Sequence, residues 1–274
     1  MIVRVLYKIV VSTFIMKSQL SITEKRAISS KNLQNRLNLN KKLGSKDLTK
    51  WLFSRYKIRR SDKILELGCG IGSHVLIESK IIGSNGLILA TDYSKKSLDI
   101  LKKKIKNKNI KIKCISMDNV PKYLKSQKIM FDKIISSYAL YYAKNPIKVI
   151  KECSVYLKEK GEFLITAPCY PHTLTEFALK EKTLPPLAKK YIDFSSKKLE
   201  IFLSRNRSSK KIFNFKNILK FVNLNDLIHF YRSTVFYNKK SEANLINLFL
   251  KEKKKLGYYN IIKSARLYKF KRRK

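Results

Sequence analysis

Residues 63–72 read KILELGCGIG, and the rest of the chain can be interpreted outward from them. The first five residues are a short apolar run typical of a buried strand, and glycines then occupy alternate positions, at Gly68, Gly70 and Gly72. Glycine lets the backbone approach a ligand closely and directs the amides of a following helix toward that ligand. The stretch therefore predicts a strand, a ligand-binding turn and a helix over residues 73–81.

The same alternation of strand and helix continues after this turn. Further strands are predicted at 86–92, 110–116, 131–137 and 161–168, with helices at 94–106 and 145–158. Asn145 and Pro146 suit the cap and first turn of the second of these helices. Strands alternating with helices at this spacing predict right-handed βαβ units and a parallel, doubly wound sheet.

The flanking segments are predicted to cover or complete this sheet. Residues 17–44 form one or two cover helices, and 47–57 form an amphipathic helix in which Trp51 is a packing anchor beside Leu48, Leu52 and Tyr56. After a helix at 173–182, basic amphipathic helices are expected across 187–222. Two extended segments, 227–237 and 260–271, are expected to flank a helix at 242–255.

These elements divide the chain into four expected regions. They are an N-terminal extension with cover helices (1–44), a ligand-binding core (45–170), a helical substrate-side insertion (171–225), and last strands with a helix that complete the sheet (226–274).

Acidic residues follow three successive strands, where ligands of such sheets bind. Glu66 precedes the glycines, Asp92 ends the second strand, and Asp118 with Asn119 follows the third. A carboxylate at Glu66 would repel a pyrophosphate but suits a ligand that carries an ammonium and a sulfonium. Each acid alone could be a helix cap or turn former, whereas three together indicate a site.

With these residues in place, the sequence resembles the class I S-adenosylmethionine-dependent methyltransferases. The motifs that carry the resemblance are ILELGCGIG (64–72), LILATDYS (87–94), SMDNVP (116–121), FDKIISSYALYY (131–142) and YLKEKGEFLITAP (156–168). They cover residues 45–168 well and the remainder weakly. The resemblance implies a Rossmann-like, seven-stranded sheet, mostly parallel with an antiparallel last strand, and S-adenosylmethionine as cofactor.

The resemblance also implies a role for individual residues. Glu66, Gly68 and Gly70 would line the methionine end with Gly72 supporting the turn, Asp92 would bind the ribose, and Tyr93 would pack on the adenine. Asp118 and Asn119 would meet the adenine amino group, and Ser136 and Ser137 would border the sulfonium. Tyr138, one of three tyrosines after the fourth strand with Tyr141 and Tyr142, and His172 are the candidate catalytic residues on the acceptor side. His74 and His229 are interpreted as structural.

The region after the fourth strand favours a small-molecule acceptor. Enzymes that methylate exocyclic base nitrogens typically have an Asn/Asp-Pro-Pro-aromatic run there, and this chain has Ser-Ser-Tyr-Ala-Leu-Tyr-Tyr instead. No cysteine pair stands where a C5-methylating enzyme would need its nucleophile. An RNA methyltransferase that uses the lysine runs at 102–113 and 251–255, or a noncatalytic methyltransferase-like partner, remains an alternative.

Charge is the unusual property of the composition. The 61 Lys and Arg against 19 Asp and Glu give a net charge of +42, which favours anionic partners. The charge is either drift from an A/T-rich coding sequence or a selected property. Residues 171–274, with 26 basic and 7 acidic side chains, hold the largest excess. An anionic acceptor is therefore one class that the sequence permits.

The remaining expectations concern location. The four cysteines show no metal or disulfide spacing, so free thiols, no metal and a cytoplasmic protein are expected. The longest apolar run near the N-terminus, residues 9–16, is far shorter than the roughly 20 residues that cross a bilayer. It is therefore no transmembrane segment. Residues 1–16 fit an upstream-assigned start, an interfacial helix or a strand, and a secretory signal is disfavoured.

Overall fold

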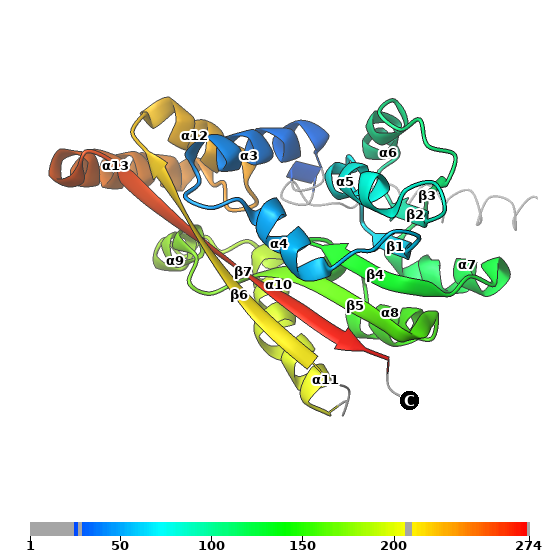
Figure 1. Cartoon of the computed structure of the whole chain (residues 1–274). Helices are drawn as coiled ribbons and strands as arrows, with labels where there is room; N and C mark the ends of the chain where they lie inside the picture. Colours follow the sequence, from blue (N-terminus) through cyan, green and yellow to red (C-terminus); the bar gives the residue numbers. More distant parts are fainter. Residues whose placement is uncertain (1–24, 27–28, 206–209, 273–274) are drawn as a thin grey trace, which may run out of the picture.

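The computed structural model describes residues 25–26, 29–205 and 210–272, so the interpretations of residues 1–16 lie outside the described part of the chain. Seven strands form one sheet in the order β3-β2-β1-β4-β5-β7-β6 (Figure 1). Their bounds are β1 Lys63–Leu67, β2 Leu87–Asp92, β3 Ile110–Cys114, β4 Phe131–Ser137, β5 Leu157–Cys169, β6 Lys210–Phe221 and β7 Tyr259–Lys271. The first five are parallel, and β7 is antiparallel to both β5 and β6. The predicted fold class is confirmed.

Helices cover both faces of the parallel part of the sheet. On one face, α4 (Leu48–Tyr56), α5 (Ser73–Ile82) and α6 (Lys95–Lys102) pack with Ile64 of β1, and on the other, α7 (Val120–Gln127) and α8 (Pro146–Ser154) pack with Leu65. Successive strand residues point to opposite faces, so a strand buried on both sides is a continuous apolar run. Ile64, Leu65 and Leu67 of β1 follow this pattern, and the buried acid Glu66 is the exception.

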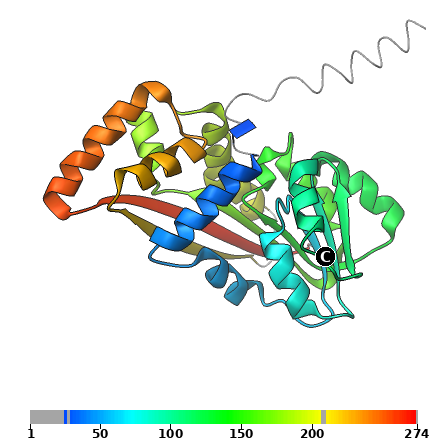
Figure 2. The same cartoon turned by 90° about the horizontal axis from the view of Figure 1, so that it is seen from above.

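A second group of helices packs where the sheet ends in β7 and β6. Helices α3 (Ser30–Leu43) and α12 (Leu224–Ser233) lie side by side there, with α13 (Glu242–Leu256) next to them (Figures 1 and 2). Gly44, just after α3, forms an isolated antiparallel bridge with Leu219 of β6, and Lys42 Nζ lies 2.9 Å from Asp226 Oδ2 of α12. These contacts attach the predicted cover helix to the far end of the sheet.

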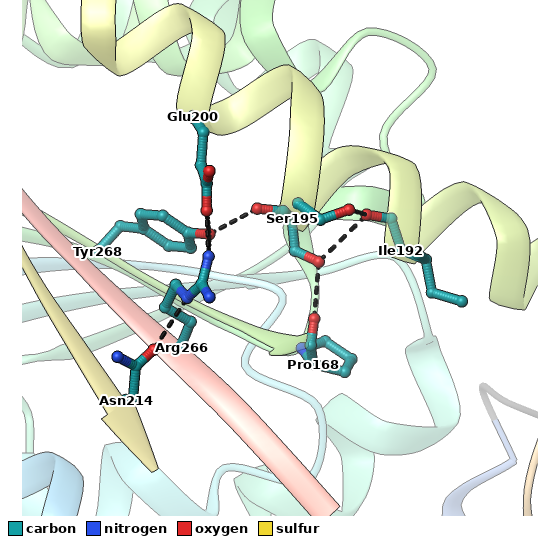
Figure 3. Close-up of polar contacts among 8 residues, drawn as sticks. Pro168, Ile192, Ser195, Glu200, Asn214, Arg266 and Tyr268 are labelled. Carbon is teal, nitrogen blue, oxygen red and sulfur yellow. Dashed lines mark hydrogen bonds and ion pairs between the residues drawn. The ribbon is translucent and has the colours of Figure 1, made fainter. Parts of the chain in front are cut away.

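Segment 173–205 continues from β5 as α9 (Thr173–Lys180), α10 (Pro186–Asp193), the π-helical turn Phe194–Lys198 and α11 (Leu199–Arg205). A polar cluster attaches it to the sheet (Figure 3). Ser195 Oγ donates to Pro168 O at 2.7 Å, and Tyr268 Oη donates to Ser195 O at 2.5 Å. Arg266 pairs with Glu200. Pro168 on β5 and both Arg266 and Tyr268 on β7 therefore position the helices above them.

Two sequence predictions in the C-terminal third are wrong. Residues 210–221, expected to be helical, form strand β6, and residues 227–237, expected to be extended, begin with helix α12. In β6 the buried residues alternate, at Phe215, Asn217, Leu219 and Phe221, which is the period of a strand. The sequence analysis predicts basic amphipathic helices across this segment. The strand that completes the sheet beside β7 therefore comes from the segment expected to be a helical insertion.

At α12 the error is reversed, because a segment predicted to be a strand forms a helix. Its buried residues Leu227, Phe230 and Tyr231 follow the i, i+3, i+4 spacing of a helix, and Asn223 caps its start. The aromatic and β-branched content of 227–237 favours a strand, but burying one helical face against α3 and α13 outweighs that local preference. His229, interpreted as structural within a strand, is an exposed residue of α12.

The predictions for Trp51 and for the cysteines are confirmed. Trp51 packs on Phe215 with ring centroids 5.1 Å apart and carries the Arg55 guanidinium 4.3 Å above its ring, as expected of a packing anchor. The four cysteines are free thiols. Within the described ranges, no helix has the length and apolar character needed to cross a membrane.

Candidate active site

The glycine turn after β1 is held against the end of β2. The amides of Gly68 and Cys69 donate to Thr91 O at 2.8 and 2.9 Å, and the amide of Gly70 donates to Asp92 Oδ2 at 2.8 Å. Gly68 has a φ of +75°, and a Cβ there would lie 2.3 Å from Ala139 Cβ. The turn therefore requires glycine at Gly68 both for its backbone conformation and for its close contact with the end of β4.

Helix α3 crosses above this turn. Among the described residues, a Cβ at Gly70 would meet Leu33 Cδ2 of α3 alone, at 3.5 Å. One helix thus extends from the glycine turn at Leu33 to β6 at Gly44. A helix is thus present in the N-terminal region, with Leu33 over the glycine turn, and its role as a cover over the ligand stays a prediction.

Asp92 organises the site with both carboxylate oxygens. While Oδ2 accepts from Gly70, Oδ1 accepts from the Ser94 amide at 2.7 Å. A carboxylate has about four lone-pair positions, so each oxygen keeps one for a ligand hydroxyl. Tyr93, the next residue, has 61% of its surface exposed and is available for a stacking contact.

Asp118 and Asn119 lie in the 3₁₀ turn Met117–Asn119 that follows β3. The Asp118 carboxylate accepts from the backbone amides of Lys144 at 3.0 Å and Asn145 at 3.2 Å, just before α8. It therefore joins two loops of the ligand edge. Asn119 is exposed. An adenine contact by these residues stays a prediction.

Glu66 points to the face of the sheet that α4 and α5 cover. It is 2% exposed, and Glu78 of α5 is fully buried beside it. Glu66 Oε2 and both Glu78 oxygens have no partner elsewhere among the described residues. Burial first, and the nearby Glu78 carboxyl second, raises the pKa of Glu66 well above its usual range, and burial also raises the pKa of Glu78. Sequence reasoning missed Glu78, although an acid in the otherwise apolar VLIES stretch was a visible signal.

His74 belongs to the same buried cluster. Its Nδ1 is 3.9 Å from Glu66 Oε1, and its ring meets Phe53 edge-on at 5.4 Å. Burial lowers the pKa of His74 to about 4, so the imidazole is neutral near pH 7. These contacts support the prediction that His74 is a packing residue.

The buried carboxyl pair predicts a pH-dependent stability. Folding raises the pKa of both carboxyl groups. While both groups stay protonated at low pH, the pair does not reduce the free energy of unfolding. As pH rises above the usual carboxyl range, the free energy of unfolding falls, because the unfolded state ionises first. We expect Glu78→Gln to be more stable than the wild type at pH 8 by about 1–3 kcal/mol, with a smaller difference at pH 5. Urea unfolding at both pH values measures this.

The control for this prediction is Glu176→Gln, which changes an exposed carboxylate on α9. Its difference from the wild type should be the same at both pH values. A Glu78→Gln difference that also stays constant between pH 5 and pH 8 would show that the pair does not titrate together in the folded protein.

Ser136 and Ser137 are the last two residues of β4. Ser136 is fully buried and donates to Leu67 O at 3.0 Å, so it joins β4 to β1. Ser137, the next residue, is half-buried. The observed contact of Ser136 is structural, and a contact of either serine with the sulfonium stays a prediction.

Tyr138 has an unusual backbone at the carboxyl end of β4. Its φ of +55° is rare for a residue with a Cβ and costs of order 1–3 kcal/mol. Its amide donates to Thr166 O at 2.9 Å, which helps to hold this conformation. Strained residues of this kind cluster at ligand sites. The observation supports the choice of Tyr138 among the three tyrosines.

His172 lies directly before α9. It is 8% exposed, its ring centroid is 5.2 Å from that of Phe236, and its Nδ1 has no hydrogen-bond partner in the described part of the chain. Tyr191 of α10 meets both Phe236, at 6.2 Å, and Tyr141, at 5.4 Å. The tertiary structure therefore places His172, which the sequence analysis names as a candidate, beside an aromatic cluster. Its members Phe236, Tyr191 and Tyr141 come from three separate segments.

The antiparallel strand β7 lies between β5 and β6, a glycine turn follows β1, and an acid ends β2. Together these features define a Rossmann-like class I methyltransferase. Residues 58–223 match the sequence profile of a methyltransferase-domain family, and the chain belongs to that family. S-adenosylmethionine is the methyl donor that this membership implies, in agreement with the cofactor predicted from the sequence.

Individual relatives are similar over part of the chain. A Lactobacillus johnsonii protein named demethylmenaquinone methyltransferase is 26% identical over 122 residues, 44% of this chain and 50% of that protein. A Wigglesworthia glossinidia brevipalpis protein named ubiquinone/menaquinone biosynthesis C-methyltransferase UbiE is 31% identical over 103 residues, 38% of this chain and 41% of that protein. The chain thus spans about half the length of these curated relatives or less.

A solved structure extends the similarity of fold. The YcgJ protein of Bacillus subtilis superposes with a TM-score of 0.55 at 14% identity, over 82% of this chain and 98% of that one. This likeness shows a shared fold.

The residues at the turn fit the donor. The lone pairs that Asp92 keeps suit vicinal hydroxyls, and Gly70 leaves room beneath Leu33. The buried, unpartnered Oε2 of Glu66 suits a cationic group.

Proposed function

We propose that this protein transfers a methyl group from S-adenosylmethionine to a small-molecule acceptor. The observation that carries the proposal is the glycine turn held by Asp92, with α3 crossing directly above it. The names of the two curated relatives, both quinone methyltransferases, support an acceptor of small-molecule class. That residues 45–170 form the donor-binding core is part of this proposal.

The proposed donor contacts follow from the positions of the side chains. Gly68 and Gly70 border the methionine end, Asp92 accepts hydrogen bonds from the ribose, and Tyr93 packs on the adenine. Asp118 and Asn119 border the adenine from the neighbouring loop. Glu66 contributes through the charge it acquires when a cation approaches its buried carboxyl group.

The bound donor would supply a methyl carbon on a positively charged sulfur, which is a good leaving group. A lone pair of the acceptor forms the new bond to that carbon, the carbon–sulfur bond breaks, and its electron pair stays on sulfur. The protein has to align the acceptor and exclude water. We assign the water-excluding role to Leu33 on α3 and the alignment to Tyr138 and His172, which lie at the carboxyl edge of the sheet.

Two measurements test the proposal. Isothermal titration with S-adenosylmethionine should show binding, and incubation with a labelled methyl donor should transfer label into a cell metabolite extract. Absence of donor binding by the wild type would remove every enzymatic assignment. Label that enters RNA, with binding that weakens steeply as salt rises, would instead assign an RNA methyltransferase.

A further inference from the structure

Lys263 of β7 lies at the ligand edge, and no acidic side chain in the described part of the chain pairs with it. Cys169, the last residue of β5, is paired with Ser264, so Lys263 is next to the point where β5 ends. Its Nζ donates to Asn40 Oδ1 of α3 at 2.9 Å and lies 5.4 Å from the centroid of the Phe230 ring. No carboxylate within the described ranges pairs with it. Its charge is therefore met by a neutral amide and an aromatic ring alone.

A second cation shares this environment. Arg36, one turn before Asn40 on α3, donates to Ser233 O. Burial, and then the charge of Arg36, lowers the pKa of Lys263 to about 7. Two like charges in a partly buried space disfavour each other, so an anion placed between α3 and β7 would relieve this cost. Among the titratable groups around it, Arg36 of α3 lowers the pKa of Lys263, and the charge of Lys263 in turn lowers the pKa of His172.

His172 gives an independent indication of a ligand. Burial first, and the charge of Lys263 second, lowers the pKa of His172 to about 3, so its ring is neutral. A buried nitrogen without a partner costs about 1–3 kcal/mol unless something hydrogen-bonds to it. Nδ1 of His172 is such an atom, and Phe236 packs on the same ring. A ligand here would meet one polar atom, a positive charge and an aromatic surface.

We propose that the acceptor carries a carboxylate or an ionised hydroxyl that binds Lys263, with His172 as a second hydrogen-bonding partner and an aromatic body against Phe236. This inference rests on the proposed function, because it names the class of acceptor for the same site. The acceptors that fit this site are organic anions with a flat apolar part. Among the many basic residues of 171–274, Lys263 is then one whose charge has a direct role in function.

Benzoate and benzamide test the proposal because they share a shape and differ in charge. In 0.15 M salt with S-adenosylhomocysteine present, ligand-detected NMR should show tighter binding of benzoate than of benzamide. We expect Lys263→Met to weaken benzoate binding about tenfold, the scale of a charge-assisted hydrogen bond, and to leave benzamide unchanged. Lys216→Met, an exposed lysine on neighbouring β6, is the matched control and should bind both as the wild type does.

The pH dependence provides a second measurement on unaltered protein. Benzoate is ionised throughout, whereas Lys263 loses its proton as pH rises through about 7. Wild-type affinity for benzoate should therefore fall about tenfold between pH 6 and pH 8, and that of Lys263→Met should not change. Equal affinity for the two probes, or an equal pH response in the two proteins, would overturn the inference. Binding of S-adenosylhomocysteine, recorded in the same samples, reports separately on the proposed function.

Discussion

Replacement of Asp92 by alanine should lower the affinity for S-adenosylmethionine about a hundredfold. The carboxylate holds the Gly70 and Ser94 amides at 2.8 and 2.7 Å and keeps one lone pair on each oxygen for the ribose. Hydrogen bonds to a charged group contribute about 1.5–3 kcal/mol each, so losing the turn geometry and the ribose contacts together accounts for an effect of this size. Isothermal titration measures the change.

Two further variants make the experiment specific. Asp99→Ala removes an exposed acid of α6 that pairs with Lys95 at 3.2 Å, and its affinity should equal that of the wild type. Asp92→Asn keeps one acceptor oxygen and loses the charge, so its affinity should fall between those of the wild type and Asp92→Ala. If Asp92→Ala and Asp99→Ala bound the donor equally well, Asp92 would have no part in the donor site.

Gly68→Ala should lower the free energy of unfolding by about 2–5 kcal/mol. A left-handed conformation costs about 1–2 kcal/mol for a residue with a Cβ, and overpacking a core typically adds about 1–3. At Gly68 both apply, because φ is +75° and the new Cβ would lie 2.3 Å from Ala139 Cβ. Ala139 has no side-chain torsion that could relieve the contact, so the backbone has to move.

Gly257→Ala separates the cost of the left-handed backbone conformation from the cost of overpacking. Gly257 follows α13 with a φ of +80°, and a Cβ there would meet nothing within 4 Å. We expect this variant to lose only the conformational part, about 1–2 kcal/mol. Urea unfolding of both variants gives the comparison. Equal losses would mean that the Gly68 turn tolerates a side chain and that its close approach to β4 has no energetic consequence.

The core of the fold was predictable because its signals are local. KILEL is buried on both faces, the glycines directly follow it, and each later strand is bounded by caps such as Ser94 and Asn145. Period and capping depend on neighbours within a few residues, so a single sequence contains them. The errors fell at β6 and α12, where the local preference of Phe, Ile and Lys disagreed with the burial that tertiary contacts require.

The candidate site likewise has residues that the sequence predicts and contacts that it does not. Asp92 and the glycines could be placed because strand ends meet at one edge of a parallel sheet. The pairing of Glu66 with Glu78 depends on how α5 packs on β1, and the approach of Lys263 to Asn40 joins residues more than 200 positions apart. No pattern along the chain reports such distances.

For this protein, the order of strands, helices and acids that makes a methyltransferase core was contained in the chain itself. Where α3 lies, which strand borders β7 and which charges remain without a partner were decided by tertiary packing. The physical reason is that periodicity and capping are short-range properties, whereas burial and the pKa shifts of Lys263 and His172 arise only when distant segments remove side chains from water.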